Sequence, residues 1–277
     1  MSLTINTNIM SLNAQRNLSS TQNALSTSMQ RLSSGLRINS AADDAAGLAI
    51  SVGMNAQVKS MNQAVRNAND GVSLAQTAEG SLNETTNLLT RMRELAQESA
   101  TGTVSNTQRT SIQNEFSQLS SEIDRIANAT QFNGTNLLDG TLSTGVSFQI
   151  GTNNTSNDSI SLSVTSATSS ALGVGSAAVS VSTQGTAQSA LGLIDSALSS
   201  VSTLRGTLGA VQNRLQSTIN NLQVATENVS AAMSRIRDVD VAAETANMTR
   251  ANILVQAGVS ILAQANSSPQ SALKLLQ

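Results

Sequence analysis

The chain has 277 residues, of which 39% are hydrophobic, 1% are aromatic and 12% are charged, with a formal net charge of -2. It contains no Cys and no His, so disulfides, thiolate chemistry, the commonest zinc ligand and the commonest general base are missing, and we expect neither enzymatic activity nor a metal or cofactor. The fifteen Lys and Arg residues are scattered singly and no apolar run reaches the roughly 18 residues of a membrane span, which predicts no nucleic-acid partner and no membrane insertion.

Apolar residues with alternating spacings of three and four occupy most of the first half of the chain. Such seams cover residues 18–36, 54–89 and 112–126, and the spacing is that of coiled-coil helices. Because aromatic residues are scarce and Pro269 is the one proline, the helices can be long and their packing thin. The sequence therefore predicts few, long helices.

The stretch LSSGLRINSAADDAAGLAIS, between the first two seams, is predicted to be a joint between helices. Gly35 can end the first helix in the left-handed conformation, and Ser40 with Asp43 matches the Ser-x-x-acid pattern that opens a second one. Asp43 and Asp44 then lie in the first turn, where the helix dipole favours negative charge, and Gly47 marks close helix packing. The alternative, a catalytic carboxylate pair, is disfavoured because the cap accounts for both acids and the chain has no His.

The middle of the chain predicts a small β element. Asn133-Gly134 and Asp139-Gly140 are turn dipeptides, and apolar residues alternate with polar ones over 146–150 and again over 160–164. These two runs predict a β-hairpin with a long turn. The surrounding Ser/Thr-rich segment, residues 141–190, is predicted to be a solvated loop.

The last part of the chain returns to helical patterns. Seven apolar residues, each seven positions apart, run from Ile194 to Ile236, and so strict a period predicts a left-handed supercoiled contact. The stripe from Met248 to Ala265 is too wide for one partner helix. Apolar chain ends that cannot pair fully within one chain predict a contact that repeats without closing, and hence a helical polymer. The candidate polymerisation segment comprises Met248, Ile253, Leu254, Val255, Val259, Ile261 and Leu262.

Five sequence blocks carry a family resemblance. They are RLSSGLRINSAADDAAGLAIS, ANDGVSLAQTAEGSLNET, RMRELAQESATGT, EIDRIANATQFNGTNLLDG and SRIRDVDVAAETANMTRANILVQAGVSILAQAN. Over residues 1–140 and 185–277 the chain resembles bacterial flagellin, in a short form that lacks large outer domains. The resemblance implies the structural subunit of the flagellar filament, exported unfolded by the flagellar type III apparatus and located outside the cell.

The resemblance also implies an architecture. The expected fold is mainly α, a long antiparallel coiled-coil helical rod with a small β-hairpin and with its N- and C-terminal helices paired at one end. The expected divisions are an N-terminal inner-tube helix (1–40), the N-terminal rod helices (41–130), the hairpin with the Ser/Thr/Gly-rich segment (131–184), the C-terminal rod helix (185–237) and a C-terminal inner-tube helix (238–277).

The partners that the resemblance implies are other copies of the chain, an export chaperone that holds the candidate polymerisation segment, the filament cap and hook-junction proteins, and host flagellin receptors. Arg91, Leu95 and Glu115 match positions that a vertebrate Toll-like receptor contacts in the family. The alternative for these three residues is that the charges are merely solvated and that Leu95 packs in its seam.

Other classes of protein fit less well. A chemoreceptor-like signalling coiled coil would need a membrane segment and a helical tip, and a secreted hydrolase would need a nucleophile motif and a base to activate it. A hook–filament junction protein shares the terminal helices and stays open as an alternative to the filament subunit.

Overall fold

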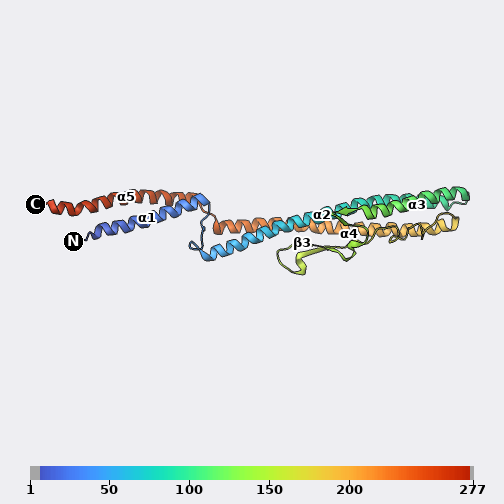
Figure 1. Ribbon diagram of the computed structural model, residues 1–277, viewed down its shortest axis with the longest axis horizontal. Coiled ribbons are helices and arrows are strands. Elements are labelled where there is room, and N and C mark those ends of the chain that lie inside the picture. The colour runs from blue at the N-terminus through green and yellow to red at the C-terminus, as the bar shows by residue number, and fades with distance from the viewer. Residues whose placement is uncertain (1–6, 275–277) are drawn as a thin grey trace. The chain divides into compact units, whose positions relative to one another are not determined.

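The computed structural model describes residues 7–274, with side chains through residue 267. Within these residues there are five α-helices (Figure 1). They are α1 (Ile9–Ser34), α2 (Ala45–Ser99), α3 (Asn106–Ala129), α4 (Gln184–Arg237) and α5 (Val241–Lys274). The prediction of a mainly α fold with few, long helices is confirmed. The expected divisions 1–40 and 238–277 extend past the described residues at their outer ends.

The chain forms two compact units. The first, the terminal unit, contains residues 1–56 and 228–277, and the second, the central unit, contains residues 57–227. Helices α2 and α4 each contribute to both units, because each is more than 50 residues long.

In the terminal unit, α1 and α5 run antiparallel and lie side by side (Figure 1). The Asn8 side chain donates a hydrogen bond to the Ala265 carbonyl at 2.8 Å, and Leu18 packs against Gly258, where a Cβ would lie 3.2 Å from Leu18 Cδ1. The Asn8 side chain also accepts from the Ser11 N–H and caps α1. The pairing of the two terminal helices is therefore confirmed.

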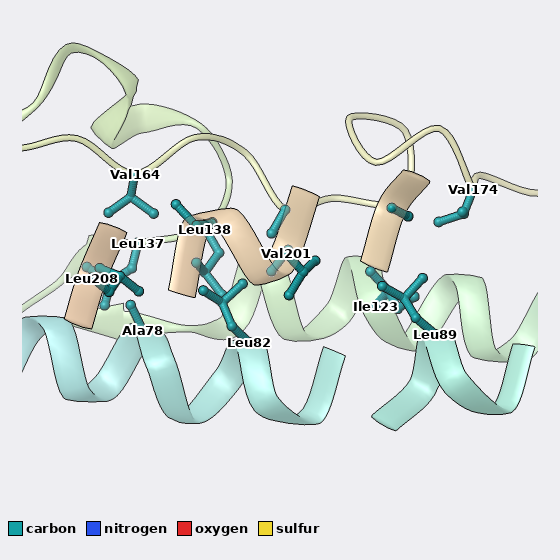
Figure 2. Close-up of a cluster of buried hydrophobic side chains, with 14 of the residues drawn as sticks. Ala78, Leu82, Leu89, Ile123, Leu137, Leu138, Val164, Val174, Val201 and Leu208 are labelled. Carbon is teal, nitrogen blue, oxygen red and sulfur yellow. The ribbon is translucent and has the colours of Figure 1, made fainter. Parts of the chain in front are cut away.

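The central unit is built around residues of the predicted seams (Figure 2). Leu82, Leu89, Phe116 and Leu208 are all fully buried, because one apolar residue per seam turn faces the neighbouring helices. Helix α3 begins with a capping box, in which Ser105 and Gln108 exchange hydrogen bonds.

Four short strands form two antiparallel hairpins in the central unit. In the first, β1 (Gln131–Phe132) pairs with β2 (Thr135–Asn136), and the turn between them has positive φ at Asn133 and Gly134. In the second, β3 (Val146–Gln149) pairs with β4 (Ser159–Leu162), with Phe148 opposite Ile160. The predicted hairpin over these two apolar runs is confirmed. Short 3-10 turns lie at Thr141–Thr144 and Ser156–Asp158.

The prediction of a solvated loop over 141–190 is wrong. Val164, Val174 and Val181 are fully buried, and Figure 2 shows Val164 and Val174 within the cluster of core side chains. The Asp124 carboxylate accepts from the backbone N–H of Ser169 at 2.8 Å and from its hydroxyl at 2.7 Å. The few valines of this segment face the helices, and its serines form hydrogen bonds with buried polar groups. The prediction failed because it used the average composition of the segment, which does not show which residues face the core.

Candidate assembly surface and interhelix joint

The joint begins where α1 ends at Gly35. Gly35 has φ 73°, and its N–H donates to the Arg31 carbonyl at 2.9 Å, so the glycine closes the helix in the left-handed conformation as the sequence predicts. The joint then turns through residues 36–44 before α2 begins at Ala45.

The prediction that Ser40 opens the second helix is wrong. Asp44 caps α2 instead, because its Oδ1 accepts from the Gly47 N–H at 2.9 Å and its carbonyl accepts from the Leu48 N–H at 3.0 Å. Asp43 and Asp44 therefore precede the first turn of α2 and do not lie within it. A Ser-x-x-acid pattern fits a turn as well as a capping box, and only the direction of the hydrogen bonds separates the two.

Ser40 and Asp43 form a separate turn within the joint. Asp43 Oδ2 accepts from the Ser40 N–H at 2.9 Å, the Ser40 hydroxyl at 3.0 Å and the Asn39 N–H at 3.2 Å. These bonds, led by that of the Ser40 N–H, lower the pKa of the Asp43 carboxyl. Both acids thus have structural partners, which fits the interpretation of this stretch as a joint.

A side chain at Gly47 would force its neighbours to move. A Cβ there would be 2.4 Å from Asp44 Oδ2 and 2.7 Å from Ile38 Cδ1, and Ile38 is 1% exposed. The close packing expected from the sequence is present, but its partners are the capping residue and the joint rather than a second helix.

The joint pairs with the connection between α4 and α5, and no sequence pattern predicts this pairing. The Arg37 N–H donates to the Arg237 carbonyl at 2.6 Å, and the Val239 N–H donates to the Gly35 carbonyl at 3.1 Å. Asp240 then caps α5, since its Oδ1 accepts from the N–H groups of Ala242 and Ala243. This cap could have been predicted from the sequence, because an Asp directly before a helical apolar stripe is a typical helix start.

The paired helices α1 and α5 present apolar side chains to solvent. We call this set the assembly surface; its exposed members are Ile9, Met10, Leu12, Met29, Val241, Ile253, Leu254, Val259 and Ile261, each more than half exposed. Met248, Val255 and Leu262, from the candidate polymerisation segment, are half-buried. Nine large apolar residues exposed on one pair of helices are more than the single surface residues that a monomer ordinarily leaves in water, so the assembly surface is of the kind that a partner covers.

Charge is sparse on the same helices. Residues 9–34 and 241–267 carry four charged side chains, Arg16, Arg31, Glu244 and Arg250. Low charge favours close approach of another apolar surface, because few ions have to be desolvated.

The structure brings together two of the three residues matched to receptor contacts. Arg91 on α2 donates to Glu115 on α3 at 2.8 Å and to Glu94 at 3.0 Å, and these hydrogen bonds, that of Glu115 foremost, raise the pKa of Arg91. Leu95 is only 2% exposed and belongs to the core of the central unit. Direct receptor contact by Leu95 is therefore contradicted, and the seam-packing alternative explains this residue.

No helix in the described part of the chain is both long enough and apolar enough to serve as a membrane span.

Family comparisons match both ends of the chain. The N-terminal helical region of bacterial flagellin matches residues 5–142, and the C-terminal helical region matches residues 191–276. Flagellin of Halalkalibacterium halodurans is 49% identical over 273 residues, which is 99% of each chain. B-type flagellin of Pseudomonas aeruginosa is 51% identical over 173 residues, and the match covers 62% of this chain but 35% of that protein.

Comparison with solved structures also points to flagellar proteins. The crystal structure of Bacillus cereus flagellin has a TM-score of 0.50 at 31% identity, over 61% of this chain and 94% of that one. A structure assigned to a flagellar hook-associated protein of Vibrio parahaemolyticus has a TM-score of 0.59 over 71% of this chain and 100% of that one, and at 15% identity it shows the fold alone. The matches at both ends and the full-length relative together show that the chain belongs to the bacterial flagellin family, a family of structural filament subunits.

Proposed function

We propose that this chain polymerises with copies of itself into the bacterial flagellar filament and that α1 and α5 make the innermost contacts. The observation that carries the proposal is the assembly surface, which is apolar, low in charge and left uncovered by the residues of the chain that the structure describes. Contacts between different patches of identical subunits repeat without closing and produce a helical polymer. Because the chain belongs to the flagellin family, the proposal also includes export of the unfolded chain by the type III apparatus and an extracellular location. It further includes contacts with the filament cap and hook-junction proteins.

Negative-stain microscopy of purified protein at rising concentration tests the proposal. We expect monomers at low concentration and long filaments above a critical concentration, because each added subunit buries its assembly surface. Short closed oligomers or monomers at every concentration would contradict the filament function, and short oligomers would favour the hook–filament junction alternative.

A second proposed partner is an export chaperone that holds the candidate polymerisation segment. Ile253, Leu254 and Ile261 are exposed on α5, so an amphipathic helix carrying them can lie in an apolar groove of another protein. We expect a peptide of residues 235–277 to bind the chaperone of the same flagellar system and a Leu254→Asp, Leu262→Asp peptide to bind at least about 100-fold more weakly, because two anchors are lost. Isothermal titration measures both affinities.

The matched control for the chaperone experiment is a Thr249→Asp, Gln256→Asp peptide. It adds the same charge to the same helix at two exposed polar positions, so it should bind within about threefold of the unchanged peptide. Equal weakening of both variants would indicate a charge effect and would remove the assignment of Leu254 and Leu262 as anchors.

We also propose that Arg91 and Glu115 form a receptor contact. Both are about half exposed, and their ion pair holds them together across α2 and α3. Arg91→Ala should lower activation by monomeric protein in a flagellin-receptor reporter assay by about tenfold or more, since Arg is a frequent interface anchor. The fold should survive, because an exposed ion pair contributes about 0–1 kcal/mol to stability.

Arg125→Ala is the matched control, because Arg125 is also exposed and also pairs with one turn-distant carboxylate, Glu122, at 2.6 Å. It should keep full activation. If Arg91→Ala activates the receptor as strongly as Arg125→Ala does, Arg91 is an ordinary solvated charge.

A further inference from the structure

The methionines of this chain differ sharply in their exposure to solvent. Met10 and Met29, both on α1, are 56% and 57% exposed and belong to the assembly surface. Met61 and Met92 are buried in the central unit, at 3% and 0% exposed. Solvent therefore reaches two thioether sulfurs freely in the monomer and is kept from two others. The remaining methionines within the described residues are half-buried, and they are Met54, Met233 and Met248.

The two exposed methionines lie at separate places along α1. Met10 lines a groove between α1 and α5 together with Ile261, another member of the assembly surface. Met29 is nineteen residues farther along α1, which is about 28 Å along the helix axis. A chemical change at either methionine therefore alters the assembly surface at a different place.

We propose, building on the proposed filament function, that Met10 and Met29 are oxidation sites and that hydrogen peroxide acting on them blocks polymerisation. The thioether sulfur is soft and polarisable. Its lone pair attacks one oxygen of the peroxide, so that the S–O bond forms as the O–O bond breaks. The transferred OH group gives its proton to the departing hydroxide, which leaves as water. Sulfur is thereby oxidised by two electrons to the sulfoxide, and the peroxide is reduced.

A sulfoxide in the assembly surface opposes the contact between copies. In the monomer its oxygen is hydrated, so the fold of α1 should not change. On polymerisation neighbouring copies cover the same oxygen, and the other exposed members of the assembly surface are aliphatic side chains without a hydrogen-bond donor. An acceptor that loses water without gaining a donor is unfavourable. Oxidised chains should therefore assemble poorly, as is general for interfaces in which methionine becomes the polar sulfoxide.

Peptide mapping by mass spectrometry after peroxide treatment identifies the oxidised positions. In the monomer, Met10 and Met29 should form sulfoxide at least about tenfold faster than Met61 and Met92, because the buried sulfurs react only when the core opens. In preformed filaments, the oxidation of Met10 and Met29 should be slower than in the monomer, since neighbouring copies cover them.

Sedimentation measures the critical concentration for filament formation before and after a peroxide dose that oxidises Met10 and Met29 in most chains. Oxidation should raise the critical concentration by about tenfold or more, while circular dichroism of the monomer stays unchanged. Treatment with the methionine sulfoxide reductases A and B, one for each sulfoxide epimer, should restore the original critical concentration.

A double substitution separates these two sulfurs from the rest of the chain. Met10→Leu with Met29→Leu removes both sulfurs and nearly keeps the apolar volume, so the untreated variant should assemble as the unchanged chain does. The same peroxide dose should change its critical concentration by less than about threefold, because leucine is not oxidised. Met54→Leu with Met233→Leu is the matched control, since it removes two half-buried sulfurs outside the assembly surface. This control should lose assembly on oxidation as the unchanged chain does.

Several results would overturn this inference while leaving the filament function intact. They are assembly of the oxidised chain at the unchanged critical concentration, loss of assembly in the peroxide-treated Met10→Leu, Met29→Leu variant, and loss of helicity in the oxidised monomer, which would place the effect in the fold. Equal oxidation of both methionines in monomers and filaments would overturn it too, because no neighbouring copy would then cover them. If the untreated chain forms no filament at any concentration, the proposed function fails, and the inference fails with it.

Discussion

A chain that ends at residue 239 is expected to stay soluble, monomeric and largely helical, and to form no filaments at any concentration. The core of the central unit is made of residues within 57–227, so it does not need α5. Removal of α5 takes away Val241, Ile253, Leu254, Val259 and Ile261, which are five of the nine exposed members of the assembly surface. Circular dichroism measures the helicity of the shortened chain, and negative-stain microscopy shows whether it forms filaments.

A double substitution on α5 tests whether the exposed apolar side chains, rather than the helix itself, are needed for polymerisation. Ile253→Asn with Ile261→Asn changes two side chains that are each 60% exposed, so the monomer should keep its helicity while polymerisation is lost. Leu193→Asn is the control, because Leu193 is an exposed apolar residue on α4, outside the assembly surface. Filaments from the truncated chain, or from the double variant at the unchanged critical concentration, would contradict the assignment of α5 as an assembly element.

The long helices could be predicted because their signal repeats. Ile194, Val201, Leu208 and Leu215 lie seven positions apart and are all fully buried, so a strict period in the sequence became a continuous contact in the central unit. The β-hairpin was predictable for a similar reason, since a period of two marks which side chains face the core.

The parts that could not be predicted depend on contacts between distant residues. Nothing near Gly35 indicates that its carbonyl accepts from Val239, more than 200 positions away. The buried valines between β4 and α4 have no period at all, because that segment follows the helices without regular structure of its own. The burial of Leu95 was also not predicted, because a match to a contact position in the family does not show whether the side chain faces the core.

The assembly residues were predictable only as a set. The width of the apolar stripe on α5 indicates that one partner helix is not enough, but which members remain exposed depends on where α1 lies. The structure shows Ile253 and Leu254 exposed and Val255 half-buried.

Gly47→Ala is expected to open the start of α2. The new Cβ would lie 2.4 Å from the Asp44 carboxylate and 2.7 Å from Ile38, so either the cap or the buried Ile38 has to move. Overpacking of this kind costs about 1–3 kcal/mol. Because the Gly47 and Leu48 N–H groups bond to Asp44, their amide hydrogens should exchange about 30-fold faster for a loss of about 2 kcal/mol.

Gly53→Ala is the matched control, because Gly53 lies in the same helix with no atom within 4 Å of a Cβ. There the substitution should stabilise α2 by about 0.5–1 kcal/mol, since alanine loses less backbone entropy than glycine in a helix. Hydrogen exchange followed by mass spectrometry compares the two variants over residues 44–56. Equal exchange at Leu48 in Gly47→Ala and Gly53→Ala would mean that the joint tolerates a side chain at Gly47, and that the contact of Gly47 with Asp44 and Ile38 does not hold the start of α2 in place.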